Sequence, residues 1–326
     1  MKLFGRYIYR TKFGFAQILQ EHAPDGSPVR VLKLGGVFQS AAYTDERRFE
    51  SVFEYYRAFD TVLEHPVGAA LEDDSPDGFP PCGASASFAG AAHSSDTAHS
   101  SATAARSLAV ETPDAPGHKR TDFTGSRRVL VLGGGGFAWP KHVLATHPEV
   151  SLDVVEIDSA IIRIARRHFF LDEAIERFDP AHKRLRLICD DGRAFLENAA
   201  ESSQRSYGAR PEAMRYDAIV NDAFSGAEPV RSLATVEAAQ AAKACLIPGG
   251  LYAANVVSDF DRANVAFLRD LTATLAKAFA HVHIIPCPDE DFGGEDNYLV
   301  IATDGTYDFE DAIPFDEDFL GAPMRD

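Results

Sequence analysis

Cysteine is scarce in this sequence, which has four among 326 residues: Cys82, Cys189, Cys245 and Cys287. No two of them have the short spacing of a CxxC pair, so the sequence indicates no structural zinc site and no metal cofactor. Nothing in this spacing requires an oxidising compartment. Cys189 and Cys245 lie in or beside apolar segments, and we expect both thiols to be buried.

Basic residues are also under-represented. The chain has 32 Lys and Arg against 49 Asp and Glu, which gives a formal net charge of -17. Such an excess of negative charge repels phosphates, so neither DNA nor RNA is expected as a partner. The charge would suit a cationic substrate, although an acidic composition is more often related to solubility.

Long apolar runs are absent as well. No stretch of the sequence is long enough to cross a bilayer as a helix. The first 19 residues carry scattered basic residues and no continuous apolar core, so they resemble neither a signal peptide nor a membrane anchor. The sequence therefore predicts a soluble, cytoplasmic protein with no membrane partner.

What is present falls into three zones. Residues 1–66 predict a small N-terminal domain of short antiparallel β-hairpins plus a helix, because segments rich in β-branched and aromatic residues alternate with Gly, Pro and Asp. The helix is expected within residues 45–66, where apolar residues at helical spacing predict core packing. Residues 67–126 are small and polar, and we predict a low-complexity, disordered insertion.

The third zone, residues 127–326, alternates between strand and helix patterns. We expect strands, with the loops that end them, at 127–136, 152–158, 183–192, 216–224, 251–259, 281–287 and 297–304. We expect helices at 140–148, 159–174, 193–203, 232–250 and 265–279. This alternation predicts an α/β, Rossmann-like sheet that is mostly parallel and covered on both faces. The last two strands have no helix between them and should form a hairpin with one antiparallel terminal strand.

A glycine-rich loop follows the first strand of this zone. The segment "GGGGFA" matches G-x-G-x-x-G/A, and Glu156 follows about 20 residues later at the end of the next strand. Gly133 and Gly135 would let ligand atoms approach the backbone closely. A carboxylate at the end of the second strand can accept both hydroxyls of an adenosine ribose. The pattern is typical of sites for NAD and also of sites for S-adenosylmethionine.

The ends of the next strands favour S-adenosylmethionine. The third strand ends in Asp190 and Asp191, and a carboxylate there can accept a hydrogen bond from an adenine amino group. The fourth ends in Asn221 and Asp222, which would face the crevice of an open α/β sheet. An acidic pocket suits a sulfonium cation with an ammonium group better than it suits a pyrophosphate. A dinucleotide site and a glycine turn without a ligand stay open as alternatives.

At these motifs the sequence resembles the spermidine synthase (polyamine aminopropyltransferase) family, and in particular a divergent spermidine-synthase-like branch. "GGVFQS" is similar to the family's "DGVxQS" hairpin, "VVEID" to its second strand, and "CDDGRAFL" to its "GDGxxFL" segment. The resemblance implies a class I S-adenosylmethionine-dependent methyltransferase fold and a homodimer. It also implies the residues that hold the donor, either S-adenosylmethionine or its decarboxylated form: Gln39, Gly133, Gly135, Glu156, Asp191 and Gly192.

Two positions depart from the family pattern. The family's glycine loop reads "GGGDGG", and this chain has Gly136 where the family has an aspartate. The family's catalytic loop reads "DSSDP", and the corresponding "DAFSG" places Ser225 where the family has its proton-accepting aspartate. A serine hydroxyl is a poor base, and loss of a general base typically slows a reaction about 10²–10⁴-fold. Asp222 is the leading catalytic candidate among the pocket acids, where it would hold the donor's ammonium or orient the acceptor, or it is simply a solvated carboxylate at a strand end. Ser225 is the second candidate, at the base position.

Other residues could complete the acceptor side of the pocket. Loop acids could replace the missing carboxylates, or could simply be solvated: Glu228, Asp289, Glu290 and Asp291. Tyr55 and Tyr56 could reach the same side from the preceding helix. Trp139 could form a wall of the pocket, although packing at the start of the following helix is its more common role.

Three functions follow as hypotheses. The first is a spermidine-synthase-like transferase that passes an alkyl group from a sulfonium donor to a small-molecule acceptor such as a cationic amine. The second is an S-adenosylmethionine-dependent methyltransferase acting on a small molecule. The third is a ligand-binding homologue without catalysis. Retention of Gln39, Glu156 and Asp191 favours continued ligand binding, whereas Gly136 and Ser225 argue against ordinary putrescine chemistry.

Overall fold

The structure, a computed structural model, describes residues 2–3, 6–65, 127–205, 215–225, 228–258, 264–288 and 296–326. All of them belong to one of the two units into which the chain divides, a unit made of residues 1–70 and 119–326. The predicted insertion at 67–126 lies outside the described residues, so its predicted disorder stays a prediction.

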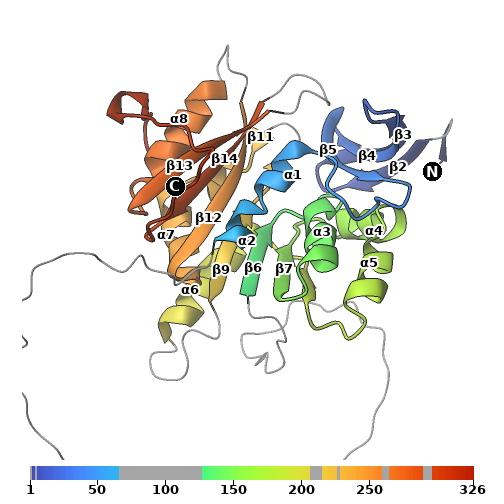
Figure 1. Ribbon diagram of the computed structural model, residues 1–326, viewed down its shortest axis with the longest axis horizontal. Helices are drawn as coiled ribbons and strands as arrows, with labels where there is room; N and C mark the ends of the chain where they lie inside the picture. Colours follow the sequence, from blue (N-terminus) through green and yellow to red (C-terminus); the bar gives the residue numbers. More distant parts are fainter. Residues whose placement is uncertain are drawn as a thin grey trace, which may run out of the picture. The chain divides into compact units, whose positions relative to one another are not determined.

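The N-terminal residues form a five-stranded antiparallel sheet, drawn in blue in Figure 1. Its strands follow one another in chain order: β1 (Lys2–Leu3), β2 (Arg6–Thr11), β3 (Gly14–His22), β4 (Pro28–Leu34) and β5 (Val37–Tyr43). Gly35 and Gly36 join β4 to β5 with φ angles of 62° and 90°. A two-residue hairpin loop with both φ angles positive matches the twist of the strands it connects, and glycine adopts it without strain. This turn brings Val37 to Gln39 to the edge of the sheet.

The helix predicted within residues 45–66 is only partly correct. The structure has two short helices there, α1 (Glu54–Ala58) and α2 (Thr61–Glu64). The apolar residues predicted to pack in the core are all buried: Phe49, Val52, Phe53, Tyr56, Phe59 and Leu63. Burial therefore followed the apolar pattern even where the helix did not form.

The C-terminal residues form a seven-stranded sheet in the order β13-β14-β12-β9-β6-β7-β8. Its strands are β6 (Arg127–Leu132), β7 (Val150–Val155), β8 (Leu185–Ile188), β9 (Tyr216–Asn221), β12 (Leu246–Ser258), β13 (His281–Cys287) and β14 (Asp296–Thr303). Strands β8, β7, β6, β9 and β12 pair in parallel, while β14 runs antiparallel to both β12 and β13. The predicted sheet and its terminal hairpin are thus confirmed.

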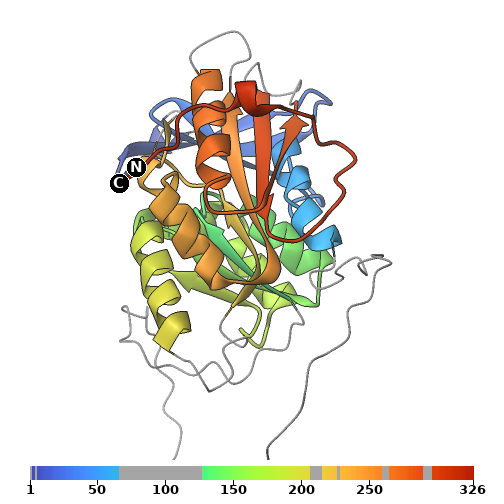
Figure 2. The ribbon, with the colours of Figure 1, turned by 90° about the vertical axis from the view of Figure 1, so that its left-hand side faces the viewer.

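Helices cover both faces of this sheet. Val129 and Val131 of β6 belong to one apolar cluster, together with residues of α3 (Ala138–Thr146) and α5 (Leu171–Phe178). Leu130 and Leu132 belong to a second cluster, with residues of α6 (Gly192–Arg205), α7 (Val236–Cys245) and α8 (Asn264–Leu275). Successive side chains of a strand point to opposite faces, so an apolar run such as β6 requires cover on both sides. Figure 2 shows the yellow and orange helices on one side of the sheet and the light-blue helices on the other.

The single helix predicted at 159–174 is interrupted. The structure has α4 (Ser159–His168) and then α5, with Phe170 between them at a φ of 59°. The carbonyls of His168 and Phe169 at this break accept hydrogen bonds from the side chains of Arg30 and Lys141. Cationic side chains that reach the last carbonyls of a helix stabilise its end. Partners distant in sequence therefore set this boundary.

The expectation of two buried thiols holds for one of them. Cys245, at the end of α7, is buried, but Cys189 is exposed. Cys189 follows β8, the edge strand of the sheet, so no further strand covers it. Within the described part of the chain, no helix combines the length and apolarity needed to span a bilayer.

Candidate functional site

A cavity of about 740 Å³ lies at the carboxyl ends of β6 and β9 and is lined by both sheets. The chain runs outward from β6 to β7 and β8, and then returns to β9 on the other side of β6. Ligands of open α/β sheets bind at such a reversal of strand order. Most of the predicted site residues line this cavity: Gln39, Gly133, Gly135, Glu156, Asp191, Gly192 and Asp222. Ser225 is described only in its backbone, where it pairs with Glu228, so its predicted role stays a prediction.

The glycine turn begins with Gly133, which has a φ of 94°. A Cβ built on this residue would collide with the backbone carbonyl of Asp222 and would lie 3.1 Å from the Cα of Ala223. Only glycine satisfies both the positive φ and this close approach. The turn that ends β6 is therefore pressed against the end of β9.

Glu156, directly after β7, is bonded to the glycine turn. Its Oε2 accepts hydrogen bonds from the N–H of Gly134 at 2.9 Å and of Gly135 at 3.3 Å, and its Oε1 accepts one from the N–H of Asp158 at 2.9 Å. The residue is 7% exposed and lines the cavity. Burial raises the pKa of this carboxyl, and the three N–H donors oppose that rise. A carboxylate offers about four acceptor positions, so it retains capacity for a ligand hydroxyl.

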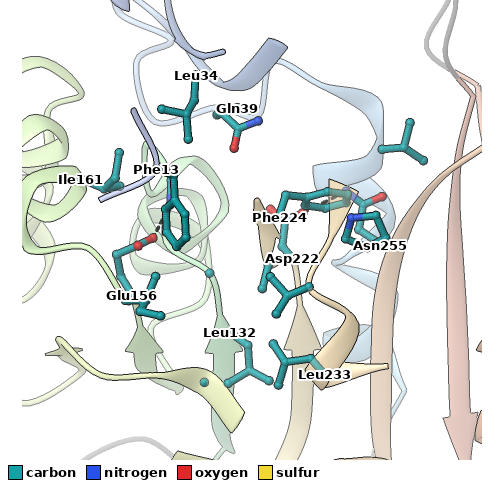
Figure 3. A pocket seen from close by; sticks show the side chains of 18 of the residues that line it. Phe13, Leu34, Gln39, Leu132, Glu156, Ile161, Asp222, Phe224, Leu233 and Asn255 are labelled. Atoms are coloured by element: carbon teal, nitrogen blue, oxygen red, sulfur yellow. Dashed lines mark hydrogen bonds between the residues drawn. The ribbon is translucent and has the colours of Figure 1, made fainter. Parts of the chain in front are cut away.

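Asp158 links the N-terminal sheet to this end of the cavity through hydrogen bonds. Its Oδ1 accepts from the N–H of Ala160 at 2.8 Å, which caps the start of α4, and its Oδ2 accepts from the N–H of Lys12. Lys12 belongs to the turn between β2 and β3, where the next residue, Phe13, lines the cavity with 42% of its surface exposed. In Figure 3 the Phe13 ring lies beside Glu156.

Asp191 caps a helix in addition to lining the cavity. Its Oδ1 accepts from the N–H groups of Arg193 at 2.9 Å and Ala194 at 3.0 Å, which caps the start of α6. Gly192 beside it faces the side chains of Leu132 and Leu233, and a Cβ at Gly192 would lie 3.5 Å from Leu233. These residues form an apolar part of the cavity wall that also contains Asp191.

Asp222 lies at the other end of the cavity from Glu156 (Figure 3). Its Oδ1 accepts a hydrogen bond of 2.9 Å from Nδ2 of Asn255, a residue of β12. Burial raises the pKa of Asp222 to about 7, and the Asn255 hydrogen bond opposes this rise. The group can therefore exchange a proton near neutral pH.

The structure also decides between the two interpretations of several other residues. Trp139 is buried and donates from Nε1 to Oδ1 of Asp60 at 2.8 Å, so it packs at the start of α3 instead of forming a wall of the cavity. Tyr55 lines the cavity, whereas Tyr56 is buried in the core.

The position of Gly136 has no room for a side chain without rearrangement, because a Cβ there would lie 2.6 Å from Oγ of Ser40. The predicted loop acids Asp289, Glu290 and Asp291, and the side chain of Glu228, lie outside the described residues.

Three of the residues in the cavity wall that sequence reasoning missed are Phe13, Phe53 and Asn255. Phe13 comes from a hairpin turn far from the glycine loop, Phe53 precedes α1, and Asn255 lies within the apolar strand β12. Asn255 could have been noticed, because it is the one strongly polar residue in "LYAANVV" apart from the tyrosine. Phe13 and Phe53 carry no comparable local signal, since buried or turn aromatics are common.

The strand order, the reversal between β6 and β9 and the carboxylate after β7 define a methyltransferase-like α/β fold with an accessory N-terminal sheet. Residues 116–287 match the family model described as the spermine/spermidine synthase domain. This match covers more than half of the chain, which therefore belongs to the spermidine synthase family.

Sequence relatives with curated names include polyamine aminopropyltransferases. The chain is 31% identical over 131 residues to that of Vibrio vulnificus, a match covering 40% of this chain and 38% of the relative. It is 33% identical over 159 residues to polyamine aminopropyltransferase 2 of Hyperthermus butylicus, covering 48% of this chain and 46% of the relative. The chain thus spans less than half the length of these curated relatives.

Solved structures share the fold over nearly the whole chain. A probable spermidine synthase from Corynebacterium glutamicum superposes with a TM-score of 0.57 and 20% identity, covering 92% of this chain and 81% of the other. The spermidine synthase of Thermotoga maritima gives a TM-score of 0.55 and 16% identity, covering 94% and 75%. At these identities the likeness establishes the fold.

Proposed function

We propose that this chain is an aminopropyltransferase-like transferase that binds decarboxylated S-adenosylmethionine and passes its aminopropyl group to an amine. The observation that carries the proposal is the position of Glu156, which is buried, bonded to the glycine turn and part of the same cavity wall as Asp222. The names of the curated relatives support the reaction class. A solved spermidine synthase with 16% identity was crystallised with the transition-state analogue AdoDATO.

The donor fits the residues along the cavity. The ribose hydroxyls would bind the Glu156 carboxylate, and the adenine ring would lie against the wall formed by Leu132, Gly192 and Leu233, with its amino group toward Asp191. A volume of about 740 Å³ lies within the usual range for ligand pockets. The sulfonium and the aminopropyl chain would then extend toward Asp222, whose negative charge favours a cation.

The transfer itself needs an unprotonated amine. The nitrogen lone pair of the acceptor attacks the aminopropyl carbon bonded to sulfur, the carbon–sulfur bond breaks, and the neutral thioether methylthioadenosine leaves. The new carbon–nitrogen bond yields an ammonium, and its proton passes to Asp222, whose pKa of about 7 suits this task. Asp222 thereby takes the role for which Ser225 is chemically unsuited. Positioning of the two reactants supplies most of the remaining acceleration.

A thermal-shift experiment tests the proposal. The full chain is heated with decarboxylated S-adenosylmethionine, S-adenosylmethionine, methylthioadenosine or NAD. A ligand at a hundred times its dissociation constant stabilises a protein by about 2.7 kcal/mol, which is easily measured. We expect the decarboxylated donor and methylthioadenosine to stabilise the chain most. Preference for intact S-adenosylmethionine would indicate methyl transfer instead, and a response to NAD alone would reject both.

Turnover separates an enzyme from a ligand-binding homologue. Methylthioadenosine release from the decarboxylated donor, measured with a mixture of primary amines, should exceed the rate without amine. Binding of the donor without any amine-dependent release would indicate that the chain keeps the ligand site and has lost the reaction.

A further inference from the structure

Asn255 carries a buried polar atom that has no partner among the residues that the structure describes. The residue is 7% exposed, and its Nδ2 donates to Oδ1 of Asp222. Its own Oδ1 is buried and accepts no hydrogen bond among the described residues. A buried acceptor left unpaired costs about 1–3 kcal/mol, so such an atom in a native fold requires an explanation.

Ionisation of Asp222 fixes the orientation of this amide. An ionised carboxylate only accepts hydrogen bonds, so in that state Nδ2 of Asn255 faces Asp222 and its Oδ1 faces away from it. Asn255 lines the cavity, as does Asp222, and Figure 3 shows the two side by side. The amide oxygen and the carboxylate thus form a pair of adjacent acceptors. Two adjacent acceptors match a group with two or more N–H donors, such as a primary amine.

The wall around this pair is apolar. Phe224 lines the same cavity, and so does Val257, which lies two residues farther along β12 on the same face as Asn255. Asn297 of β14 pairs with Val257 and also lines the cavity. Phe53 adds a further aromatic side chain from the segment before α1, a helix that packs against β14.

Among the described side chains around Asn255, charges are few. Asp222 is a carboxylate, Asn255 and Asn297 are amides, and Phe53, Phe224 and Val257 are apolar. One carboxylate and one amide oxygen can hold one ammonium or amine head. A second ammonium on the same molecule would lie against apolar side chains, where an unpaired charge is strongly disfavoured.

We propose that the Asp222 end of the cavity is an acceptor subsite for a monoamine with an apolar or aromatic body, and that Asn255 selects and orients its amino group. The proposal rests on the proposed function, because it identifies the class of amine that the transferase would use. Asn255 acts here as a specificity-determining residue through its Oδ1.

Isothermal titration of the full chain tests the proposal. The protein is titrated with 2-phenylethylamine and with putrescine, each with and without saturating methylthioadenosine. We expect 2-phenylethylamine to bind at least about 10-fold more tightly than putrescine, because its ring replaces water at apolar walls. Equal or tighter binding of putrescine would overturn the proposal, as would failure of both amines to bind in either condition.

Three variants give the residue-level test. Asn255→Leu removes the acceptor at nearly constant volume, and we expect 2-phenylethylamine affinity to fall at least about 10-fold while methylthioadenosine affinity is unchanged. Asn255→Asp keeps an acceptor, so amine binding should survive and shift toward putrescine. Asn198→Leu, on the exposed side of α6, is the matched control. Unchanged amine affinity in Asn255→Leu would contradict the assignment.

Different outcomes of these experiments would reject the proposed function and the monoamine subsite. If methylthioadenosine does not bind, the proposed function fails, and the amine preference of the unloaded protein still decides the subsite. If methylthioadenosine binds and putrescine is preferred, the donor site stands and the monoamine subsite is wrong.

Discussion

Glu156 and Gly134 are joined by a hydrogen bond of 2.9 Å from the glycine N–H to Oε2 of the carboxylate. The bond links the end of β7 to the turn after β6, so the same carboxylate orders the turn and faces the cavity. Sequence spacing alone suggested a ribose contact. The structure adds that the carboxylate is already fixed in place, which lowers the entropy lost when a ligand binds.

Removal of this carboxylate should abolish adenosine binding. We expect Glu156→Ala to weaken methylthioadenosine binding at least about 100-fold, because two charge-assisted hydrogen bonds to the ribose are lost. Calorimetric titration measures the effect. Glu176→Ala, on the exposed side of α5, is the control and should bind like the unmodified chain. Near-normal affinity in Glu156→Ala would mean that another group holds the ribose.

Substitution at Gly133 tests the close approach of β6 and β9. Gly133→Ala introduces both the strain of a φ of 94° and a collision with the Asp222 carbonyl. We expect a loss of about 3 kcal/mol or more in the free energy of unfolding, measured by urea denaturation. Gly26 has a φ of 82° but open space around it, so Gly26→Ala should lose only about 1–2 kcal/mol. Equal losses in the two variants would show that the contact with Asp222 is unimportant.

The protonation of Asp222 should shape the pH dependence of transfer. Its pKa is raised to about 7 by burial, so the base form predominates above pH 7 and the rate should fall as the pH drops through that value. Asp222→Asn should lower the rate about 10²–10⁴-fold and remove this step from the profile. Asp172→Asn, on the exposed side of α5, should leave the profile unchanged.

The raised pKa of Asp222 should also make the stability of the folded protein depend on pH. The folded pKa of Asp222 lies above the value of about 3.9 for an unfolded aspartate, so its stabilising contribution is complete below pH 3.9 and is lost as the pH rises through 7. Asp222→Asn should therefore raise the melting temperature of the ligand-free protein more at pH 8 than at pH 5. A larger gain at pH 5 would contradict the raised pKa.

Phe13 is expected to cover the bound ligand. Its ring lies beside Glu156 at the cavity edge, and 42% of its surface is exposed in the ligand-free chain. We expect Phe13→Ala to weaken methylthioadenosine binding about 10-fold through lost apolar burial, with little change in the melting temperature of the ligand-free protein. Phe15, 64% exposed and outside the cavity wall, gives the control Phe15→Ala. Equal affinities for these two variants would exclude a covering role for Phe13.

The ends of the parallel strands could be read from the sequence because of a simple geometric rule. Parallel strands of one sheet end at the same edge, so Gly133, Glu156, Asp191 and Asp222 had to lie near one another once the alternation of strand and helix was recognised. The antiparallel pairing of β14 with β13 followed from the missing helix between them, whereas the order of the strands came from the structure. The helix boundaries did not follow, because at Phe170 they depend on Arg30 and Lys141 from other elements.

The sequence by itself determined the class of fold and the residues at the Glu156 end of the cavity, since both depend on local patterns and on where strands end. Only the tertiary structure decided the other end. Phe53 and Asn255 are about two hundred residues apart in the sequence, and both line the cavity because the segment around α1 packs against β14, the strand that pairs with β12. The lack of space at Gly136 likewise depends on Ser40, which no local pattern could reveal. Side-chain packing between distant segments is a property of the folded chain, and it is this packing that gathers apolar side chains at the Asp222 end of the cavity.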